Sequence, residues 1–321
     1  MRALVAGGAG FLGSHLCERL LNDGHEVVCL DNFITGTPRN IAHLRASDRF
    51  SLVEADVAET PDIAADVVLH LASPASPADY ERLPVVTMRA NALGTWRLLD
   101  VCGRTGARLV FASTSEVYGD PLVHPQPEAY WGNVDPIGPR SCYDESKRFA
   151  EALIMAVRRE RGVRANIVRI FNSYGPRMRS NDGRAIPELM TAALRGRPMG
   201  VHGDGSQTRS FCYVSDLVAG LAMLAIDETI DGEVFNLGNP AELSIRQLAE
   251  AIRRVTGSDS PIETIAARPG DPERRRPDIT RIRERYGWSP KVELGDGLIT
   301  TAEWFRAELA IAVDEGTAPR P

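Results

Sequence analysis

Short apolar runs alternate with longer stretches in which apolar residues recur every three to four positions along the first half of the chain. The apolar runs lie at residues 2–6, 26–30, 50–55, 66–72, 107–112 and 163–171. Runs of this length are typical of strands buried in a parallel sheet, and the stretches between them are typical of helices. The alternation therefore predicts an α/β fold with a doubly wound parallel sheet over residues 1–171.

Two long helices are predicted, separated by a stretch rich in proline. The helices cover residues 84–104 and 143–161. The first has an apolar stripe formed by Val85, Met88, Ala92, Trp96 and Leu99. Because proline cannot continue a helix or a central strand, residues 121–139 are predicted to form a loop, and we expect it to lie over the functional site.

The regular alternation weakens after residue 171. Helical patterns recur near residues 186–195, 215–227 and 244–256, with basic loops at 175–184 and 268–277. We therefore expect a smaller C-terminal α/β substrate domain over residues 172–313, from which one strand and one helix could return to the first domain. Residues 314–321 are expected to form a tail.

Composition and charge exclude several classes of protein. The chain has 321 residues, of which 43% are hydrophobic and 25% charged, as in ordinary globular proteins. Its formal net charge of -6 provides no overall basic field for nucleic acid or an anionic membrane. Five scattered cysteines lack metal-ligand spacing, and their odd number argues against a disulfide framework, so we expect free thiols in a reducing cytoplasm and no metal site. No apolar run approaches the ~18 residues of a membrane span, and no leader is recognisable.

A glycine-rich turn joins the first predicted strand to the first predicted helix. Gly7, Gly10 and Gly13 follow the spacing G-x-x-G-x-x-G, with Phe11 and Leu12 between the last two. The early glycines permit a tight turn and the close approach of a pyrophosphate, and the last lets the helix pack against the strand. Because the motif lies directly between a strand and a helix, it predicts a Rossmann domain that binds a dinucleotide.

The ends of the following strands provide the other predicted cofactor contacts. Asp31 lies 18 residues after Gly13, where a carboxylate would accept hydrogen bonds from the adenosine ribose. A carboxylate there repels a 2′-phosphate, which favours NAD over NADP, although Asp31 could instead be a simple turn residue. The remaining predicted cofactor residues also lie at strand ends: Asn32, Asp56, Val57, Leu71, Ala72 and Ser73.

Tyr143 and Lys147 are the candidate proton-transfer pair. They are four residues apart on a predicted helix, so their side chains lie on one face, one turn apart. Free tyrosine has a pKa of about 10, and a cation held nearby lowers that pKa. The pair could then accept a proton from a sugar hydroxyl near neutral pH. The spacing alone would also fit an ordinary surface helix.

These residues and several longer stretches resemble a known family. The chain resembles, over nearly its whole length, the extended short-chain dehydrogenase/reductases and among them the NAD-dependent epimerase/dehydratase family. The general marks are the glycine turn, the Tyr143–Lys147 pair and the loop 268–271. More specific stretches are similar to the family's UDP-glucuronate decarboxylases, and they lie at residues 70–77, 113–121, 124–128, 130–133, 136–145, 169–172, 174–178, 181–184, 203–209 and 275–279.

The resemblance implies an activity and a set of catalytic residues. It implies oxidation of UDP-glucuronate at C4 by bound NAD, loss of C6 as CO2, and reduction of the 4-keto intermediate to UDP-xylose, with NAD recycled in each turnover. Tyr143 would take the proton of the 4-hydroxyl, Lys147 would tune Tyr143 and bind the nicotinamide ribose, and Thr114 would orient the same hydroxyl. Glu116 is the candidate for organising water or protons at C5, with a solvated loop carboxylate as its alternative.

Ser115 separates this activity from that of the related 4,6-dehydratases. Those enzymes have aspartate at this place as the acid that expels the C6 hydroxyl, and serine cannot supply that proton at neutral pH. A 4-epimerase acting on another nucleotide sugar remains an alternative. A non-catalytic NAD sensor or scaffold is a further alternative, although such a protein need not keep Thr114, Tyr143 and Lys147.

The resemblance also implies residues that hold the substrate. Arg209 and Arg268 occupy family positions that contact the diphosphate, and arginine suits phosphate because it can bind it through two hydrogen bonds. The other predicted substrate residues are Arg89, facing the sugar carboxylate, together with Ser115, Asn172 and Arg275. Arg184 is expected to reach the cofactor or the sugar. A homodimer formed through the helices at 84–104 and 143–161 is expected as well.

Overall fold

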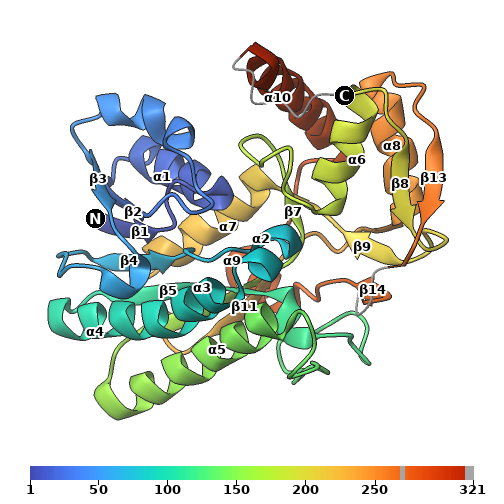
Figure 1. Cartoon of the computed structure of the whole chain (residues 1–321). Coiled ribbons are helices and arrows are strands. Elements are labelled where there is room, and N and C mark those ends of the chain that lie inside the picture. Colours follow the sequence, from blue (N-terminus) through green and yellow to red (C-terminus); the bar gives the residue numbers. More distant parts are fainter. Residues whose placement is uncertain (268–271, 315–321) are drawn as a thin grey trace.

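Seven parallel strands form the central sheet of the molecule (Figure 1). The structure is a computed structural model that describes residues 1–267 and 272–314, without the side chains of 311–314. The strands stand in the order β3-β2-β1-β4-β5-β6-β11. Their bounds are β1 (Arg2–Ala6), β2 (Glu26–Asp31), β3 (Phe50–Glu54), β4 (Val67–His70), β5 (Arg108–Thr114), β6 (Ala165–Ile170) and β11 (Val234–Leu237).

The six strands predicted from apolar runs are all present, and the α/β fold class is confirmed. The chain moves outward from β1 to β2 and β3, then returns to pair β4 with the other side of β1. The strand order therefore reverses between β1 and β4. In open α/β sheets, ligands bind beyond the carboxyl ends of the strands at such a reversal.

Helices cover both faces of the sheet and bury its apolar residues. The helices α1 (Phe11–Asn22), α7 (Val214–Ile226) and α9 (Thr280–Tyr286) contribute to one core cluster. On the other face lie α4 (Thr95–Thr105) and α5 (Ser141–Arg161), whose side chains fill a second core cluster. Two short helices, α2 (Pro77–Arg82) and α3 (Pro84–Arg89), precede α4. Short 3-10 helices cover Pro38–Ala46, Val57–Glu59 and Ser115–Tyr118.

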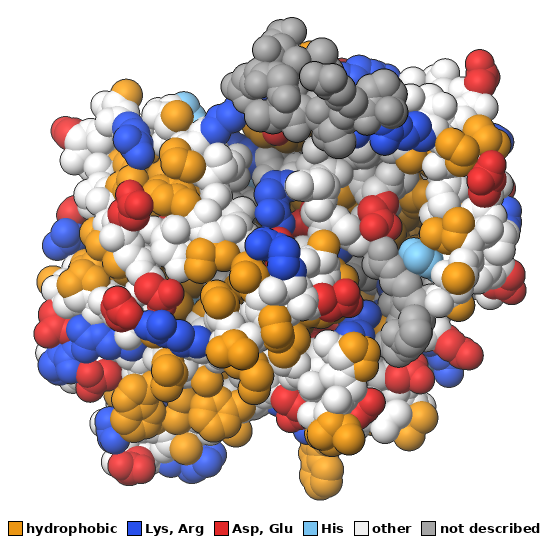
Figure 2. All heavy atoms as spheres, viewed as in Figure 1, with side chains coloured by type: hydrophobic (Ala, Val, Ile, Leu, Met, Phe, Trp, Pro, Cys, Tyr) orange, Lys and Arg blue, Asp and Glu red, His pale blue; other side chains and the backbone are white. Residues whose placement is uncertain are grey.

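The predicted helix at 84–104 forms as α3, a π-helical turn at Ala90–Gly94, and α4. Most of its apolar stripe does not face the core, since Val85, Met88 and Trp96 are exposed. The buried side presents small and polar residues instead, such as Asn91, whose amide donates to the Ser146 hydroxyl of α5 at 2.9 Å. These small side chains let α5 pack closely against this side of the helix. The opposite side, which carries the exposed apolar residues, contributes to the apolar surface visible in Figure 2.

The C-terminal part forms a separate layer beside the sheet. A third core cluster lies among α6 (Ala185–Leu194), α8 (Ile245–Thr256) and α10 (Leu294–Asp314). Its short strands pair as β7 (Ser173–Tyr174) with β10 (Cys212–Tyr213), as β8 (Met199–His202) with β13 (Ile262–Ile265), and as β9 (Thr208–Ser210) with both β12 (Glu242–Ser244) and β14 (Arg274–Arg275).

The chain crosses the expected boundary at residue 171 more than once. The helix α7 packs against α1, and β11 pairs with β6 as the seventh strand of the large sheet. One strand and one helix thus return to the first domain, and α9 joins them there. Of the expected tail, Asp314 ends α10, and residues 315–321 lie outside the described part of the chain.

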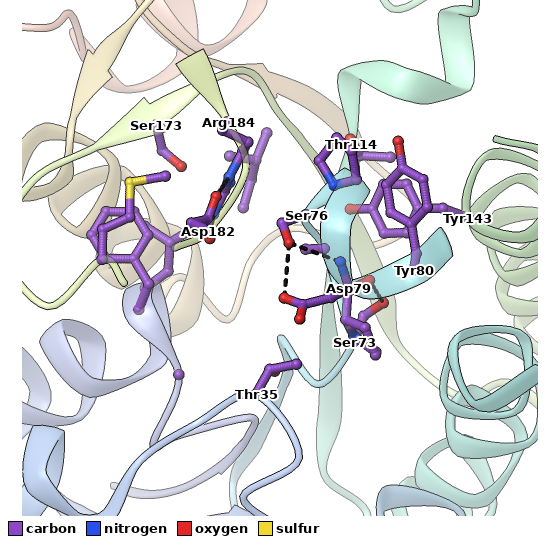
Figure 3. Close-up of a pocket in the computed structure, with 18 of the residues that line it drawn as sticks. Thr35, Ser73, Ser76, Asp79, Tyr80, Thr114, Tyr143, Ser173, Asp182 and Arg184 are labelled. Atoms are coloured by element: carbon purple, nitrogen blue, oxygen red, sulfur yellow. Dashed lines mark hydrogen bonds and ion pairs between the residues drawn. The ribbon is translucent and has the colours of Figure 1, made fainter. Parts of the chain in front are cut away.

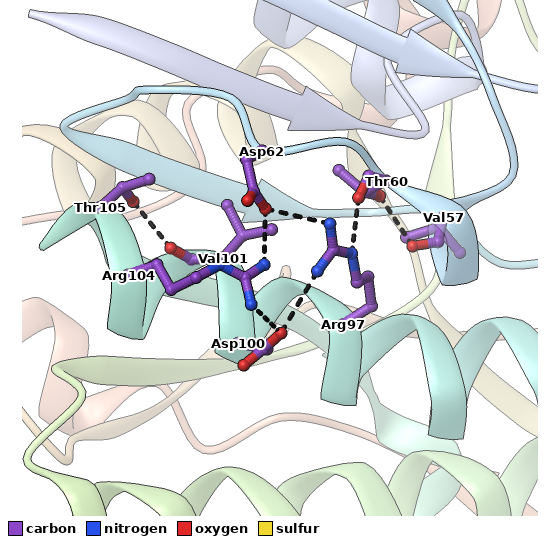
Figure 4. Close-up of polar contacts among 8 residues, drawn as sticks. All are labelled: Val57, Thr60, Asp62, Arg97, Asp100, Val101, Arg104 and Thr105. Atoms are coloured by element: carbon purple, nitrogen blue, oxygen red, sulfur yellow. Dashed lines mark hydrogen bonds and ion pairs between the residues drawn. The ribbon is translucent and has the colours of Figure 1, made fainter.

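An ion-pair network holds the segment after β3 to α4 (Figure 4). Asp62 accepts from Arg97 at 3.0 Å and from Arg104 at 2.5 Å, and both arginines also contact Asp100. Arg97 also donates to the Thr60 carbonyl at 2.6 Å. Exposed pairs contribute little to stability one by one, so the network mainly fixes where the segment runs. Among the described residues, none of the helices is both long and apolar enough to span a membrane.

Candidate active site

A cavity of about 320 Å³ opens at the carboxyl ends of the strands, between the sheet and the C-terminal layer (Figure 3). One wall is the glycine turn after β1, and the opposite wall comes from α6 and the residues before it. The catalytic candidates from β5 and α5 lie at the cavity as well. Segments far apart in the sequence therefore meet at the strand-order reversal.

The glycine turn leaves no room for side chains where it meets the sheet. Gly7 has a φ of +79°, and a Cβ there would lie 2.6 Å from the Ala72 nitrogen. A Cβ on Gly13 would lie 2.0 Å from the Gly7 carbonyl oxygen. Gly10, Phe11 and the first turn of α1 line the cavity. Backbone N–H groups at a helix N-terminus attract phosphate oxygens, so this wall suits a pyrophosphate.

Asp31 lies at the end of β2 with its carboxylate held in place. The carboxylate accepts hydrogen bonds from the backbone N–H groups of Ala9 at 2.9 Å and Phe33 at 2.8 Å. Burial raises the pKa of Asp31, and these N–H groups act in the opposite direction. The next residue, Asn32, donates to Asp56 at 3.3 Å. Both acidic residues line the cavity, as expected for groups that meet the adenosine half of a dinucleotide.

The other predicted cofactor residues lie around the same cavity. They are Leu12, Val57, Leu71, Ala72, Ser73 and Arg184. Thr35 and Asn40 also line the cavity and were not predicted. The cradle that a Cβ would fill, the helix N-terminus and the oriented Asp31 carboxylate together fit NAD.

Tyr143 and Lys147 point into the cavity from α5, and both are buried. Figure 3 shows Tyr143 beside Thr114, across the cavity from Arg184. The Lys147 ammonium donates to the Ala112 carbonyl at 2.8 Å and lies 5.8 Å from the centre of the Tyr143 ring. The predicted i, i+4 pair thus faces the end of β5, where Thr114 stands.

The structure does not show the lowered pKa that the sequence predicted for Tyr143. Burial raises the pKa of Tyr143, and interaction with the Thr114 side chain only partly opposes that effect. Burial also lowers the pKa of Lys147 to about 7, because water no longer solvates its charge. The i, i+4 spacing indicates the nearby cation but not the burial of the two side chains, which dominates both pKa values.

Glu116 is held by two arginines. Its carboxylate accepts from Arg140 and from Arg275, and all three side chains line the cavity. Burial alone would raise the pKa of Glu116, but Arg275 and Arg140 together lower it to about 2. Glu116 is therefore an ionised carboxylate at neutral pH and not a solvated loop residue.

Arg275 has unused hydrogen-bonding capacity at the cavity. Its side chain is buried, and its Nε and one terminal nitrogen have no hydrogen-bond partner among the described residues. Buried donors without partners are costly, so they favour a ligand that accepts from them. The predicted substrate residues Ser115, Asn172 and Arg209 also line the cavity, whereas Arg268 lies outside the described residues.

The Arg89 side chain does not lie where the sequence predicted it. It was expected to face the sugar carboxylate, but it is half-exposed and pairs with Glu59 at 2.5 Å. It is also absent from the cavity wall. The close packing of the neighbouring helix turn on α5 directs Arg89 sideways, toward the 3-10 helix that contains Glu59.

The loop at 121–139 also differs from its predicted position over the functional site. None of its residues lines the large cavity. Instead it runs beside that cavity and walls a second one of about 270 Å³ through Asn133, Val134, Asp135, Gly138 and Pro139.

Tyr80 is the principal site residue that sequence reasoning missed. It lies on α2 and stacks on Tyr143, with ring centres 5.2 Å apart and planes 8° apart. Its hydroxyl is buried and has no hydrogen-bond partner within the described ranges of the chain. Next to it, Asp79 accepts from Arg179, and both line the cavity. No local pattern in the sequence marks Tyr80, because its stacking partner Tyr143 lies on a different helix far along the chain.

Comparison with known proteins decides the family. The sequence pattern described as "NAD dependent epimerase/dehydratase family" matches residues 3–238. The chain belongs to the NAD-dependent epimerase/dehydratase family. Members of this family use NAD, in agreement with the fit of the glycine turn and Asp31.

Curated members of the family match the chain almost from end to end. The "UDP-glucuronic acid decarboxylase 1" of Xenopus tropicalis is 48% identical over 320 residues, which cover 100% of this chain and 76% of that protein. The "UDP-glucuronic acid decarboxylase 5" of Arabidopsis thaliana is 48% identical over 312 residues, which cover 97% of this chain and 91% of that protein.

Solved structures of family members share the whole fold. A UDP-glucuronic acid 4-epimerase from Bacillus cereus, in complex with UDP-glucuronic acid and NAD, has a TM-score of 0.86 at 31% identity and covers 96% of this chain and 100% of its own. A dTDP-glucose 4,6-dehydratase from Streptomyces venezuelae with NAD bound has a TM-score of 0.88 at 30% identity, covering 97% and 98%.

Proposed function

We propose that this protein is a UDP-glucuronate decarboxylase that forms UDP-xylose through a 4-keto intermediate with internally recycled NAD. The near end-to-end identity with curated decarboxylases supports the substrate and the reaction. The site observation that favours this reaction is the triplet after β5, in which Ser115 stands between Thr114 and an ionised Glu116. Neither Ser115 nor Glu116 can donate the proton that a dehydratase needs to expel a hydroxyl.

The first step belongs to Tyr143 and Thr114. The glycine turn and Asp31 would hold NAD, which would supply the chemistry of hydride removal from C4 of the sugar and of its return. The Tyr143 oxygen removes the proton of the 4-hydroxyl, and Thr114 holds that hydroxyl in line. Lys147 donates to the Ala112 carbonyl and lies 5.8 Å from the centre of the Tyr143 ring, where its ammonium, when protonated, would favour the phenolate against the effect of burial.

The second step needs little help from an acid. Once C4 is a ketone, the substrate is a β-keto acid, so the C5–C6 bond breaks and its electrons move to the ketone oxygen. The C6 carboxylate leaves as CO2, and C5 then takes up a proton. The Arg275 donors that lack a partner in the described part of the chain would support the substrate beside the reacting carbons, and Arg209 lies at the cavity, where it would contact the diphosphate.

An assay with UDP-glucuronate and NAD tests the proposal. The purified protein is incubated with both compounds, and CO2 and the nucleotide-sugar product are followed. We expect stoichiometric CO2 and UDP-xylose without net reduction of NAD. Absence of CO2 above background would contradict the proposal. Formation of UDP-galacturonate instead would identify a 4-epimerase, the activity named for the Bacillus cereus structure.

We also propose that the protein is a homodimer in the cytoplasm. Five large apolar side chains are exposed on the face formed by α3, α4 and α5 with the π-helical turn between α3 and α4: Val85, Met88, Leu93, Trp96 and Phe149. Contiguous apolar surface of this kind marks protein–protein contacts (Figure 2). All five cysteines are unpaired, which supports a reducing compartment.

A further inference from the structure

Two buried polar atoms beside the catalytic pair have no partner among the described residues. One is the Oδ1 atom of Asp144 and the other is the hydroxyl of Tyr80. Asp144 follows Tyr143 on α5, and its side chain is 7% exposed. A buried carboxylate oxygen without a donor is costly as an anion, so its position calls for a function or a proton.

Asp144 lines the second cavity, which adjoins the catalytic one. Glu116, Arg140 and Arg275 line both cavities, whereas Asp144 lines only the second. The cluster of Glu116 and its two arginines therefore separates the substrate site from Asp144. On its far side the second cavity is walled by Asp120 and by residues of the 133–139 segment, several of which are exposed. Its wall carries the charged side chains of Asp120, Asp135 and Asp144, and its volume of about 270 Å³ is large enough to hold water.

Decarboxylation consumes one proton that the substrate does not supply. The C5–C6 bond breaks, its electrons pass to the C4 ketone oxygen, and CO2 leaves. A C5–H bond then forms as those electrons return to carbon. The proton that Tyr143 takes from the 4-hydroxyl is returned to the same oxygen when C4 is reduced. One proton per turnover must therefore come from outside the substrate and reach C5.

Glu116, the candidate from the sequence for organising protons at C5, cannot store this proton. Glu116 is ionised, with a pKa of about 2, because two arginines hold it. Asp144 has the opposite environment, since burial and then the charge of Glu116 raise its pKa to about 7. Near neutral pH, Asp144 can therefore hold a proton and release it.

We propose that Asp144 and the second cavity form the path and the last store of the proton that decarboxylation consumes, and this inference rests on the proposed function. The proton passes from water in the second cavity to Asp144 and then, through water beside Glu116, to C5. Asp144 is recharged from the exposed rim of the cavity. It does not touch the substrate and acts through the groups between them.

Several charged and titratable groups face Asp144 and set its behaviour. On α5 these are Tyr143 and Glu145, and Arg140 stands immediately before the helix as its N-cap residue. From other elements they are Glu116, Arg275 and Tyr80, together with Asp120 and Asp135 on the cavity wall. The two arginines oppose the rise in the pKa of Asp144, and the carboxylates of Glu116 and Glu145 support it.

Asp144→Asn tests the proposal because asparagine keeps the shape but cannot deliver a proton. We expect kcat for CO2 and UDP-xylose formation to fall about 10- to 100-fold, less than for loss of a direct acid catalyst. KM should change little. The solvent deuterium isotope effect on kcat should rise, and enzyme-bound reduced nicotinamide should accumulate during turnover, because protonation of C5 becomes slow. A merely structural role would not produce these last two effects.

Glu160→Gln is the matched control. It removes one carboxylate from the last turn of the same helix, but Glu160 contacts Arg161 and lines neither cavity. We expect wild-type kcat and isotope effect from this variant. Wild-type kcat and isotope effect in Asp144→Asn as well would overturn the proposal.

Asp144→Ala with added formate provides a second, independent readout. The substitution enlarges the second cavity, and formic acid is small enough to enter it. We expect formate to restore kcat in Asp144→Ala, more strongly at lower pH, and to leave the wild type unchanged. No rescue in a folded, NAD-binding variant would count against the proton path. If the wild type released no CO2 at all, the proposed function would fail instead, so the two failures are distinguishable.

Discussion

Tyr143 is the residue on which the chemistry depends most directly. It is buried at the cavity, between Thr114 and the stacked ring of Tyr80. We expect Tyr143→Phe to lower kcat by about 10²–10⁴-fold, since it removes the proton acceptor but keeps the ring. Because the ring still packs on Tyr80, the variant should bind NAD and unfold at the wild-type temperature. Steady-state CO2 release and NAD titration measure the two effects, and retained turnover would show that the proton goes elsewhere.

Lys147 is a residue whose function costs stability. Burial lowers its pKa from 10.5 in the unfolded chain to about 7 in the folded protein. Between these values the unfolded chain binds the extra proton, so the folded state loses stability as pH falls from 10.5 to 7. Lys147→Met should therefore abolish activity while raising the free energy of unfolding by on the order of 2–4 kcal/mol at neutral pH.

Denaturant unfolding of Lys147→Met at a series of pH values measures this effect. The gain over wild type should be complete at and below pH 7 and should disappear as pH approaches 10.5, the two pKa values involved. A gain that is independent of pH would show that packing and not charge burial is responsible. A loss of stability would contradict the assignment of a strained, buried ammonium.

For single residues, the sequence predicted which side chains form the catalytic pair better than it predicted the surroundings of each side chain. The spacing of Tyr143 and Lys147 was sufficient to place them on one face of α5 at the cavity. It could not show that burial would dominate their pKa values. Nor could it place Arg89, because a long side chain on a helix can turn to either side, and Glu59 holds it away from the cavity.

Among the elements, the turn between β1 and α1 is the most tightly constrained. A Cβ on Gly13 would lie 2.0 Å from the Gly7 carbonyl oxygen, so backbone must shift. We expect Gly13→Ala to lower stability by about 1–3 kcal/mol and NAD affinity at least about tenfold. Thermal unfolding and NAD titration measure the two losses.

Gly103→Ala is the matched control for that turn. Gly103 lies in α4, where an added Cβ would meet only Val163, at 3.5 Å. Alanine is the better helix former by about 1 kcal/mol, so this variant should bind NAD normally and be slightly more stable. If both variants lost NAD affinity equally, the close packing of the turn would not be the cause.

The helices show where periodicity was insufficient. The stripe from Val85 to Trp96 has helical spacing and was predicted correctly as one face of a helix. Periodicity does not say what that face contacts, and here it faces outward. The inward face consists of Thr87, Asn91 and Thr95, whose small size and hydrogen bonds are not visible as an apolar pattern.

For the whole molecule, the sequence predicted the sheet but not how the two parts of the chain meet. Local patterns are sufficient for strands and helices, because apolar runs and periodicity are local. The contact of Glu116 with Arg275 joins residues 159 positions apart and depends on the packing of β14 on β9. The second cavity and the role of the 121–139 loop follow from that packing and have no local signature.

The exposed apolar face of α3, α4 and α5 predicts the oligomeric state. Leu93 is 58% exposed in the π-helical turn at the middle of this face. If two copies meet there, Leu93→Asp places a charge in a desolvated contact, and we expect the dimer dissociation constant to rise at least about 100-fold. Sedimentation velocity over a concentration series measures the change, and a dimer of unchanged affinity would exclude this face.

Ile137→Asp separates a specific interface from general surface hydrophobicity. Ile137 is 91% exposed, but it lies on the 121–139 loop and not on the helical face. The Ile137→Asp variant makes the same aliphatic-to-carboxylate change outside the helical face, and it should therefore leave the dimer intact.

The activity of monomeric Leu93→Asp shows whether dimerisation supports the active site. The catalytic residues Tyr143 and Lys147 lie on α5, which shares the helical face through Phe149. If dimerisation holds α5 in place, the monomer should lose NAD affinity or kcat. Full activity in the monomer would show that the interface supports assembly alone.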